Sequence, residues 1–475
     1  LSDADYSFLA ENAYDYAGYS AAGIGDVDGD GYADIAVGSA ASNAACVIYG
    51  NPSVPELWTI DVKSNAAGLR HSCVLPGDFT QPELAGIAGV GGSVQALSDV
   101  NNDGRDDFAI SAKVGANGVL LIYLGRNDGQ NVVLSSPDVI LLTGKQSGPP
   151  AYFSFCGVGD FLGSSAGDIG VGALGFMTTF TVVSGDESWT VGGDHVVDLT
   201  APGAIDHLNI SADSPIFGWG AFCNGAGDVM ATPGGGGDRS DLLLYRIAGN
   251  PDDPVYVIPG RDVTGAESVS ITLSDPAAPA GEDANVLRLR QEDYNLKTGF
   301  GGAGFFGADV TGDGVNDVIV THPGRQASAG GDGRSLYVFD GAVIGQTGGG
   351  ATLRVGGAGQ VGESWPGTNG YLLNAPLSQT VPAAAAAGNW DGWTYGGAET
   401  VELVTSDGDG VGTIRINHAT DDGEYELGLF HASDVTLSAD GVGTFGGWVA
   451  SGDVDGNGGS DIISGTASGS VVIIR

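Results

Sequence analysis

The stretch GDVDGDGYADIAVG, residues 25–38, places alternating acidic residues directly before an apolar segment. The phrase returns as SDVNNDGRDDFAIS from residue 98, ADVTGDGVNDVIVT from 308 and GDVDGNGGSDIISG from 452. Weaker copies are GDFLGSSAGDIGVG from 159, GDVMATPGGGGDRSDLLLY from 227 and GNWDGWTYGGAETVELV from 388. The leading residues recur at separations of 73, 61, 68, 81, 80 and 64; they are Asp26, Asp99, Asp160, Asp228, Asp309, Asn389 and Asp453. Such even spacing indicates seven structural units.

Each unit contains short runs of small or apolar residues bounded by Gly, Asp and Asn. In the first unit these runs are Gly18–Gly25, Ile35–Val37 and Cys46–Tyr49, and a fourth is expected in Leu57–Val62 or beyond. Short runs of this kind are typical of β-strands, and weak alternation indicates burial on both faces. Four strands in each of seven units predict an all-β fold, a seven-bladed β-propeller with four-stranded blades.

The two ends of the chain fit a closed ring. After Asp453 there is room for three strands, the last of them at Ser470–Ile474. The N-terminal segment Asp3–Ala10 is expected to dock as the outer strand of the last blade and so to close the ring. Residues 1–475 are therefore predicted to form a single domain. Two or three separate β-sandwiches are the alternative, but they would not produce one constant phrase.

Composition limits the classes of function. Acidic residues outnumber basic ones 58 to 17, for a formal charge of −41, so nucleic acids and anionic membranes would repel the chain. The acidity has two interpretations: solubility in a salty habitat, or carboxylates that hold cations. Apolar runs all fall short of the roughly 20 residues that span a bilayer. Because Leu1 is not an initiator Met and no signal pattern follows it, we expect a processed protein or an excised domain.

The acidic turns have the chemistry of a calcium loop. In turn 26–34, side chains at alternate positions (Asp26, Asp28, Asp30), the Tyr32 carbonyl and the Asp34 carboxylate can surround one hard cation. Calcium accepts 6–8 oxygen ligands in flexible geometry, whereas magnesium demands a tighter octahedron. An EF-hand would need a Glu at position 12, which is Val37 here.

The other turns differ in ligand quality. Turns 99–107 and 453–461 keep the pattern fully, and turn 309–317 keeps it with one acid replaced by Thr. Turn 160–168 has Leu162 at a ligand position, and turns 228–241 and 389–399 lose the spacing. Together these predict three or four structural calcium ions. Besides the five residues of the first turn, the predicted ligands are Asp99, Asn101, Asp103, Arg105 (carbonyl), Asp107, Asp309, Thr311, Asp313, Val315 (carbonyl), Asp317, Asp453, Asp455, Asn457, Gly459 (carbonyl) and Asp461.

These units resemble the FG-GAP repeats of integrin α-subunit propellers and their bacterial relatives. Phe-Gly openings precede three of the turns, and small residues partly keep the close; they are Phe217-Gly218, Phe300-Gly301, Phe445-Gly446 and Gly172-Ala173. The resemblance covers nearly the whole chain. It implies structural cations in the first hairpin of a blade and ligand contacts on the opposite face, on loops between blades and between second and third strands.

The four cysteines do not form a disulfide-rich scaffold. Cys46 and Cys73 lie on the third and possible fourth strands of unit one, where a disulfide and two free thiols are both compatible with the sequence. Cys156 and Cys223 are expected to remain buried thiols on inner strands. The segments Ala201–Pro215 and Gly265–Lys297 are expected to be long inter-blade loops that carry partner contacts.

The sequence predicts an extracellular, calcium-stabilised binding or adhesion module that recognises a protein or a glycan. It lacks an HExxH motif, a Gly-x-Ser-x-Gly elbow and a phosphate loop, so no catalytic constellation supports an enzyme. Two other classes stay open: a secreted polysaccharide-active enzyme such as a lyase, and a structural subunit of a surface layer or filament. Expected partners are cell-surface or matrix ligands, or other subunits of a surface assembly.

Overall fold

The computed structural model is an all-β structure. The residues it describes are 6–9, 17–39, 43–51, 58–61, 70–146, 154–172, 179–201, 205–212, 222–225, 227–230, 239–245, 255–263, 268–273, 285–291, 304–308, 315–322, 335–347, 349–355, 365–367, 370–374, 382–388, 394–395, 398–399, 402–407, 413–417, 435–438, 445–454, 461–466 and 470–474.

The repeating phrase folds as a hairpin. In the first unit, β2 (Ala17–Gly25) leads into the acidic turn, and β3 (Asp34–Ser39) begins at its last Asp and pairs antiparallel with β2. Gly25 has a φ of +71° in the left-handed region, and a Cβ there would overlap the Asp106 carboxylate. All six residues of β3 are buried, as expected from its lack of alternation.

The described strands form seven sheets of four to six strands, one for each repeat, and one two-stranded hairpin. Sheets 1–3 are built from the first three repeats. Sheet 1 contains β2, β3, β4 (Ala44–Ile48) and β6 (His71–Val74). Sheet 2 contains β7 (Ile87–Ala88), β8 (Val94–Ser98), β9 (Asp107–Val114), β10 (Asn117–Tyr123), β11 (Val139–Gln146) and β15 (His195–Asp198). Sheet 3 contains β12 (Phe155–Gly159), β13 (Asp168–Val171), β14 (Thr179–Val183), β16 (His207–Ala212) and β20 (Ser268–Leu273).

Sheets 4–7 follow in sequence order. Sheet 4 contains β17 (Phe222–Gly225), β18 (Leu242–Tyr245), β19 (Val255–Ile258), β21 (Leu287–Gln291) and β25 (Thr352–Val355). Sheet 5 contains β22 (Gly304–Ala308), β23 (Asp317–His322), β24 (Ser335–Phe339), β26 (Trp365–Gly367) and β27 (Gly370–Asn374). Sheet 6 contains β28 (Pro382–Gly388), β31 (Glu402–Asp407), β32 (Thr413–Asn417) and β33 (Val435–Ser438). Sheet 7 contains β34 (Phe445–Gly452), β35 (Asp461–Thr466), β36 (Ser470–Ile474), β1 (Tyr6–Leu9) and β5 (Trp58–Asp61).

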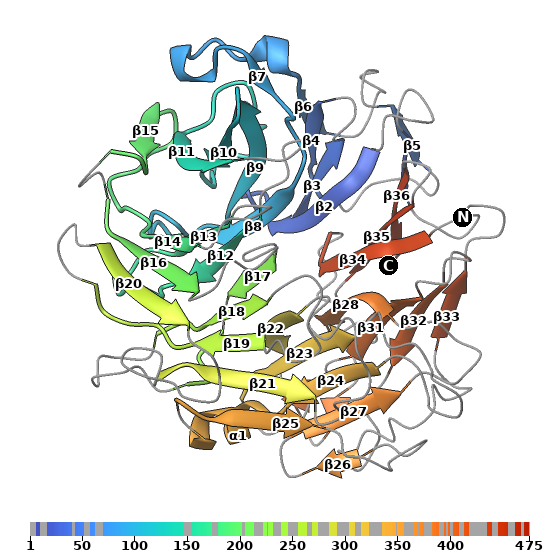
Figure 1. The fold of residues 1–475 in the computed structure, drawn as a ribbon. Coiled ribbons are helices and arrows are strands. Elements are labelled where there is room, and N and C mark those ends of the chain that lie inside the picture. Colours follow the sequence, from blue (N-terminus) through green and yellow to red (C-terminus); the bar gives the residue numbers. More distant parts are fainter. Residues whose placement is uncertain are drawn as a thin grey trace.

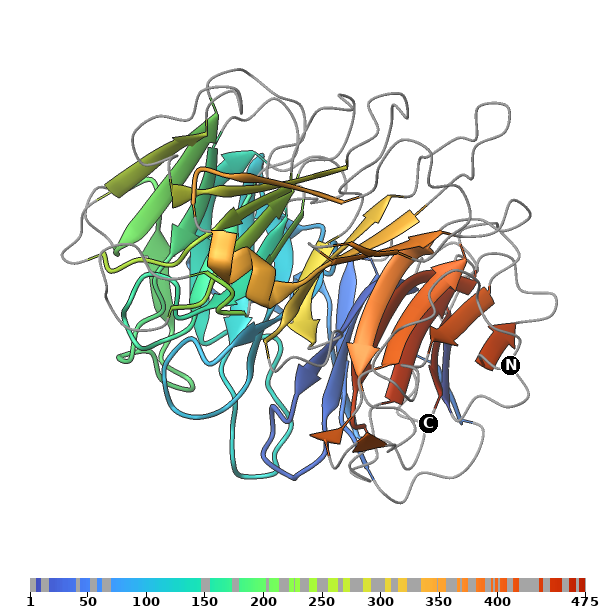
Figure 2. The ribbon, with the colours of Figure 1, turned by 90° about the horizontal axis from the view of Figure 1, so that it is seen from below.

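The few remaining elements are short. The isolated hairpin pairs β29 (Thr394–Tyr395) with β30 (Ala398–Glu399). Helix α1 (Gly341–Thr347) lies at the periphery (Figures 1 and 2), and two 3-10 turns are η1 (Pro76–Asp78) and η2 (Pro82–Leu84). Among the described residues, no helix has the length and apolar character needed to cross a membrane.

The sheets are arranged around a common centre in sequence order (Figure 1). The strand that leads into the turn of each repeat, which we call its first strand, contacts the corresponding strand of the next sheet. These strands are β2, β8, β12, β17, β22, β28 and β34, and β34 in turn contacts β2. The N-terminal strand joins the last sheet, as predicted: β1 pairs antiparallel with β36, Tyr6 opposite Ile473.

Four sheets have an additional outer strand in a parallel pairing that the sequence did not predict. β5, β15, β20 and β25 each pair parallel with the fourth strand of one sheet, although each lies between the third and fourth strands of the next sheet along the chain. The expected loops Ala201–Pro215 and Gly265–Lys297 therefore contain strands: β16 in the first, and β20 and β21 in the second. The chain reaches back to cover the outer edge of the preceding sheet.

Both cysteine pairs are disulfides. Cys46–Cys73 joins β4 to β6 inside sheet 1, with a Cα–Cα distance of 4.1 Å. The prediction that Cys156 and Cys223 remain thiols was wrong. They join β12 of sheet 3 to β17 of sheet 4, because packing of the two first strands brings their Cα atoms to 5.8 Å, within the range that a disulfide spans.

Candidate metal-binding turns

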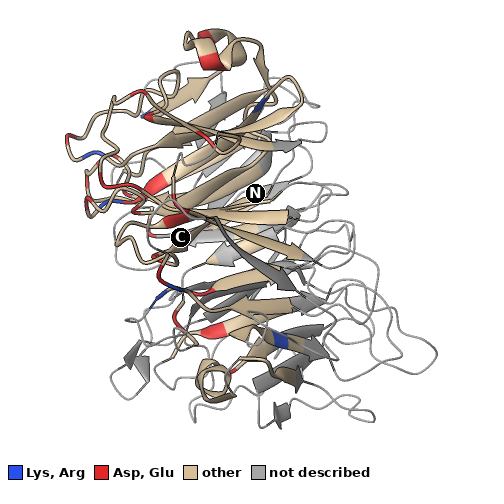
Figure 3. Cartoon of the chain, turned by 60° about the vertical axis from the view of Figure 1, so that its left-hand side comes forward, with Lys and Arg blue, Asp and Glu red and all other residues tan. Residues whose placement is uncertain are grey.

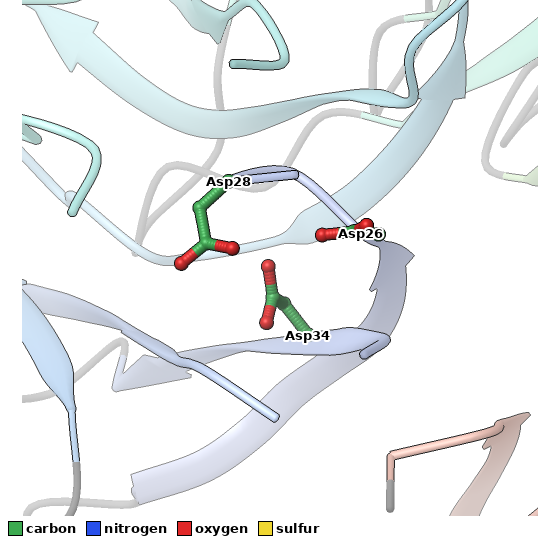
Figure 4. A group of neighbouring side chains, drawn as sticks. All are labelled: Asp26, Asp28 and Asp34. Atoms are coloured by element: carbon green, nitrogen blue, oxygen red, sulfur yellow. The ribbon is translucent and has the colours of Figure 1, made fainter. Parts of the chain in front are cut away.

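Turn 26–34 gathers three carboxylates at the end of the first hairpin. Oxygens of Asp26, Asp28 and Asp34 all lie within 4.8 Å of one another, and the three side chains point toward a shared space (Figure 4). Asp28 and Asp34 are fully buried. The structure thus brings together three of the five residues predicted as ligands in this turn, in a geometry that could hold a cation.

Backbone amides hold these carboxylates in place. Asp26 accepts hydrogen bonds from the N–H groups of Gly29 (2.8 Å), Asp30 (3.0 Å) and Gly31 (2.9 Å). The Tyr32 amide donates to Asp30 Oδ1 at 3.1 Å. The turn therefore curls around its leading Asp, and the backbone amides hold the side chains in their converging arrangement.

Arg70 provides a positive charge beside this cluster. Its guanidinium donates to Asp28 Oδ2 and, at 2.9 Å, to Asp30 Oδ2, and it stands over the Tyr49 ring at 4.9 Å from the centroid. It also donates to the Gly129 carbonyl. This contact could not be predicted from the turn itself, because Arg70 lies 40 residues beyond Asp30 in the chain.

Turn 99–107 has the same curl. Asp99 accepts the Asp103 amide at 2.9 Å and the Gly104 amide at 2.6 Å. Asp103 pairs with Arg105 of its own turn at 2.7 Å. Among the described contacts, no arginine from outside the turn reaches its carboxylates.

Asn101 gives this second turn an unfilled acceptor. Its side-chain nitrogen donates to Asp103 Oδ2 and to the Trp189 carbonyl, each at 3.2 Å, and the residue is only 7% exposed. Its Oδ1 is buried without a hydrogen-bond partner. A buried oxygen of this kind is costly unless it is satisfied, and a calcium ion, which prefers oxygen ligands, fits the donor set of this turn.

The last Asp of each turn has a second role that the sequence did not reveal. Asp107 accepts the Val100 amide on one oxygen and the Gly125 amide on the other, both at 2.7 Å. The same pair of contacts recurs for Asp34 with Val27 and Gly50, for Asp168 with Phe161 and Gly185, and for Asp241 with Val229 and Gly260. We call this arrangement the Asp clamp: one carboxylate joins its own turn to the chain leaving the third strand.

The clamp glycine is required by space. A Cβ on Gly125 would lie 2.6 Å from the Asp106 carbonyl, so any larger residue would displace the backbone. Asp317 makes the equivalent contact with the Gly341 amide at 2.9 Å, and Asp461 accepts the Val454 amide at 2.7 Å. The number of residues between the clamp Asp and its glycine varies from sheet to sheet, so the repeating phrase does not reveal this contact.

Burial raises the pKa of these clamp carboxyls, because a charged carboxylate loses water when it is buried. The pKa rises to about 8 for Asp34 and Asp107 and to about 7 for Asp168 and Asp241, despite the backbone amides that favour the charged form.

Backbone hydrogen bonds also join each turn to the next sheet. The Ala33 amide donates to the Asp453 carbonyl, the Gly167 amide to Asp99 and the Ser240 amide to Asp160. A second bond joins the residue after each clamp glycine to the preceding turn: Arg126 to Val27, Asp186 to Val100 and Arg261 to Phe161. Figure 3 shows that acidic residues gather in turns on one side of the sheets. Ordering a turn therefore stiffens a contact between sheets.

Turn 160–168 has lost the ligand pattern of the acidic turns. Leu162 occupies a ligand position there and is buried at 1% exposure, and Asp160 binds Arg239 of the next repeat. In turn 228–241, only residues 228–230 and 239–241 are described. Both turns keep the Asp clamp, through Asp168 and Asp241.

Several predicted ligands fall outside the described residues. In turn 309–317 these are Asp309, Thr311 and Asp313, and in turn 453–461 they are Asp455, Asn457 and Gly459. Of the predicted ligands in these two turns, the described ones are Val315, Asp317, Asp453 and Asp461. Asp317 and Asp461 are buried at the start of β23 and β35, Asp453 is half-buried, and Val315 packs beside the core of sheets 4 and 5. Asn389 and the segment after it, up to residue 393, are likewise outside the described set.

Comparison with known proteins agrees with this geometry. Residues 17–52, which include the whole turn 26–34, match the family model described as FG-GAP repeat. Integrin alpha-V of Gallus gallus is 30% identical over 185 residues, which covers 36% of this chain and 16% of the integrin. The chain thus corresponds to a small part of that relative's length. The FG-GAP match contains the acidic turn, and together with the integrin similarity it supports a relationship of this chain to the FG-GAP repeats of integrin α-subunits.

Proposed function

We propose that this protein is an extracellular, calcium-stabilised binding module that recognises a protein or glycan ligand. The observation that carries the proposal is the convergence of Asp26, Asp28 and Asp34 within the segment that matches the FG-GAP repeat. The similarity to an integrin α-subunit favours ligand binding over catalysis.

The proposed architecture is a single closed seven-bladed propeller. It is supported by the contact of each first strand with the next, including β34 with β2, and by the pairing of β1 with β36. In such a ring, each sheet is a blade, and the turn-to-turn backbone bonds run around one face. The N-terminal strand, held between β36 and β5, then fastens the first repeat to the last.

Calcium, when bound, would neutralise the acidic turns and supply the coordination that their oxygens lack. The chain's own contribution is to hold the oxygens in position: Asp99 by two backbone amides, Asp107 by the clamp, and Asn101 by its contact with the Trp189 carbonyl. Because the turns bond to the neighbouring sheet, filling them would stiffen the ring. An extracellular location suits modest-affinity sites, and two disulfides are typical of oxidising compartments.

The proposed ligand face lies opposite the acidic turns. In each antiparallel sheet the first connection is at one end and the connection from second to third strand is at the other. The β9–β10 connection, which contains Gly115, marks that second end in sheet 2. A rigid ring presenting loops at this end would suit recognition of an extended surface.

A calcium titration tests the proposal. Saturating calcium is expected to raise the unfolding temperature by about 5–10 °C over chelator, since a site filled at 100 times its Kd gains about 2.7 kcal/mol. Asn101→Ala should reduce this gain and remove one ion from the calorimetric stoichiometry. Ser164→Ala, at the position of turn 160–168 that corresponds to Asp103, is the control and should leave both unchanged. Equal melting with and without calcium would overturn the metal assignment.

The ligand half needs a separate measurement. Immobilised protein is probed with a glycan array and a panel of extracellular proteins, in calcium and in chelator. Calcium-dependent capture that is retained after substitution in the β9–β10 connection would place the contact elsewhere on that face. Absence of capture from both panels would contradict a binding module and favour a purely structural role.

A further inference from the structure

Turn 160–168 lacks the oxygens of a metal site, yet its leading Asp is still paired with a positive charge. Arg239 donates through Nη1 to Asp160 Oδ2, and its Nε and Nη2 contact Asp262 Oδ1 at 3.1 and 2.9 Å. The Arg239 side chain is 21% exposed, so it is largely shielded from water. Asp160 also accepts the Gly163 amide at 2.9 Å, so the turn keeps its curl.

The other ligand positions of this turn have been converted to packing. Leu162 lies in the apolar core of sheets 3 and 4 with Phe161. Ser164 Oγ donates to the Ala166 carbonyl at 3.2 Å and so is used inside the turn. A Cβ on Gly163 would lie 2.5 Å from the Asp262 carboxylate, so the small residue leaves room for the Arg239–Asp262 pair. A cation with several oxygen ligands has no place here, and a guanidinium does.

Arg239 comes from the turn of the following repeat, so its contact joins two sheets. The segment following the clamp glycine of sheet 4 runs along the same turn: the Arg261 amide donates to the Phe161 carbonyl at 2.7 Å and the Val263 amide to the Leu162 carbonyl at 2.9 Å. The same pair of sheets is joined at its first strands by the Cys156–Cys223 disulfide. Of the described turns, this is the one whose sheet contact has both a covalent link and an arginine.

We propose that Arg239 is a built-in counter-cation that replaces the metal ion at turn 160–168 and makes the contact between sheets 3 and 4 independent of calcium. The inference extends the proposed function by assigning the calcium requirement to other parts of the ring. In chelator, sheets 3 and 4 should stay joined while turns 26–34 and 99–107 loosen. The guanidinium is suited to this role because it is always charged and can bond Asp160 and Asp262 together.

Three variants of the full chain test the proposal: Arg239→Met, which keeps the aliphatic stem; Arg239→Lys, which keeps the charge; and Arg105→Met, which removes an arginine paired within a single turn. Arg239→Met should lower the unfolding temperature by roughly 1–2 °C, by the same amount in calcium and in chelator. Arg239→Lys should restore part of the loss, and Arg105→Met should cost less.

Hydrogen exchange and calcium stoichiometry separate this role from general packing. Amides of residues 160–168 should exchange faster in Arg239→Met in both buffers, and the number of bound ions should equal that of the wild type. Loss of an ion, or a defect seen only in chelator, would show that the turn holds metal and would overturn the proposal. If chelator does not change the unfolding temperature of the wild type, the proposed calcium stabilisation is contradicted, while the effect of Arg239→Met can still be measured.

Discussion

Turns 99–107 and 160–168 share their main backbone hydrogen bonds but differ in the side chains that they enclose. Both wrap their leading Asp in backbone amides, and both close with an Asp clamp, Asp107 to Gly125 and Asp168 to Gly185. Asn101 in the first turn has a buried oxygen without a partner, whereas Leu162 at the same position of the second is part of the core.

The Asp clamp and the bonds between sheets set the shape of the turn, whereas the side chains inside it decide which cation it can hold. Since the clamp and the inter-sheet bonds persist where the oxygens are lost, the turn does not need a metal to form. A metal is instead one of two ways to balance the carboxylates, and an arginine from elsewhere in the chain is the other. Turn 26–34 is intermediate, because it keeps the acidic pattern and also contacts Arg70.

The largest expected effect concerns the clamp that the two turns share. Asp107→Ala removes the side-chain acceptor of two buried N–H groups, and Asp168→Ala removes that of three, of which Phe161 N–H keeps the Gly159 carbonyl. An unsatisfied buried N–H costs about 1–3 kcal/mol. Both variants should therefore lose about 2–5 kcal/mol of unfolding free energy in chelator, measured by urea denaturation. In saturating calcium the loss should grow for Asp107→Ala, which is also a predicted ligand, and stay constant for Asp168→Ala.

The matched control for this experiment is Asp103→Ala, which removes a more exposed carboxylate of the same turn, with 25% of its side chain exposed. It should cost under about 1 kcal/mol in chelator, because its ion-pair partner, the Arg105 side chain, is 32% exposed. A clamp variant no worse than Asp103→Ala would break the comparison, since the clamp would then not be what the two turns have in common.

Substitution of Arg70 tests whether turn 26–34 can be made more like turn 99–107. Arg70→Met removes the guanidinium from Asp28 and Asp30, so the carboxylates repel one another more strongly when no cation is present. In chelator we expect a loss of about 1 kcal/mol, and in calcium a several-fold higher affinity at turn 26–34, because the ion no longer competes with an internal charge. Calorimetric titration beside Arg105→Met checks both; a lower affinity in Arg70→Met would mean that Arg70 assists the ion.

Much of the fold was predictable because its determinants are local. The acidic phrase fixes where a hairpin turns, so β3 and β9 begin at the predicted Asp34 and Asp107, and the spare N-terminal segment pairs with β36 as expected. The parallel strand β15 could not be predicted, because its four residues are ordered by pairing with β11, and the paired residues are more than 50 positions apart in the chain.

The candidate sites were predictable to the same extent. Spacing identified Asp26, Asp28 and Asp34 as neighbours, but the partners that decide their chemistry come from afar: Arg70 for turn 26–34 and Arg239 for turn 160–168. Cys156 and Cys223 are a further example, since 67 residues separate them and only the packing of β12 on β17 brings them together. Repeats reveal shared backbone, and contacts between repeats set the differences.

A pH dependence of stability is also expected at turn 160–168. Burial raises the pKa of Asp168 from 3.8 to about 7, so between about pH 4 and pH 7 the folded state holds a proton that the unfolded state has released. Folding is therefore favoured at the lower end of this window, and stability falls as the pH rises toward 7. One such carboxyl contributes a slope of at most about 1.4 kcal/mol per pH unit.

Asp168→Asn should flatten that slope between pH 5 and 7, in calcium and in chelator alike, because no ion replaces the proton at turn 160–168. The slope is the diagnostic quantity, since the variant also loses part of its clamp. Urea denaturation at several pH values measures it, and Asp128→Asn, at an exposed position, corrects for the loss of one negative charge from a chain of formal charge −41. If calcium alone flattened the slope of the wild type to that of Asp168→Asn, a metal would be binding at this turn, and the distinction between the two turns would fail.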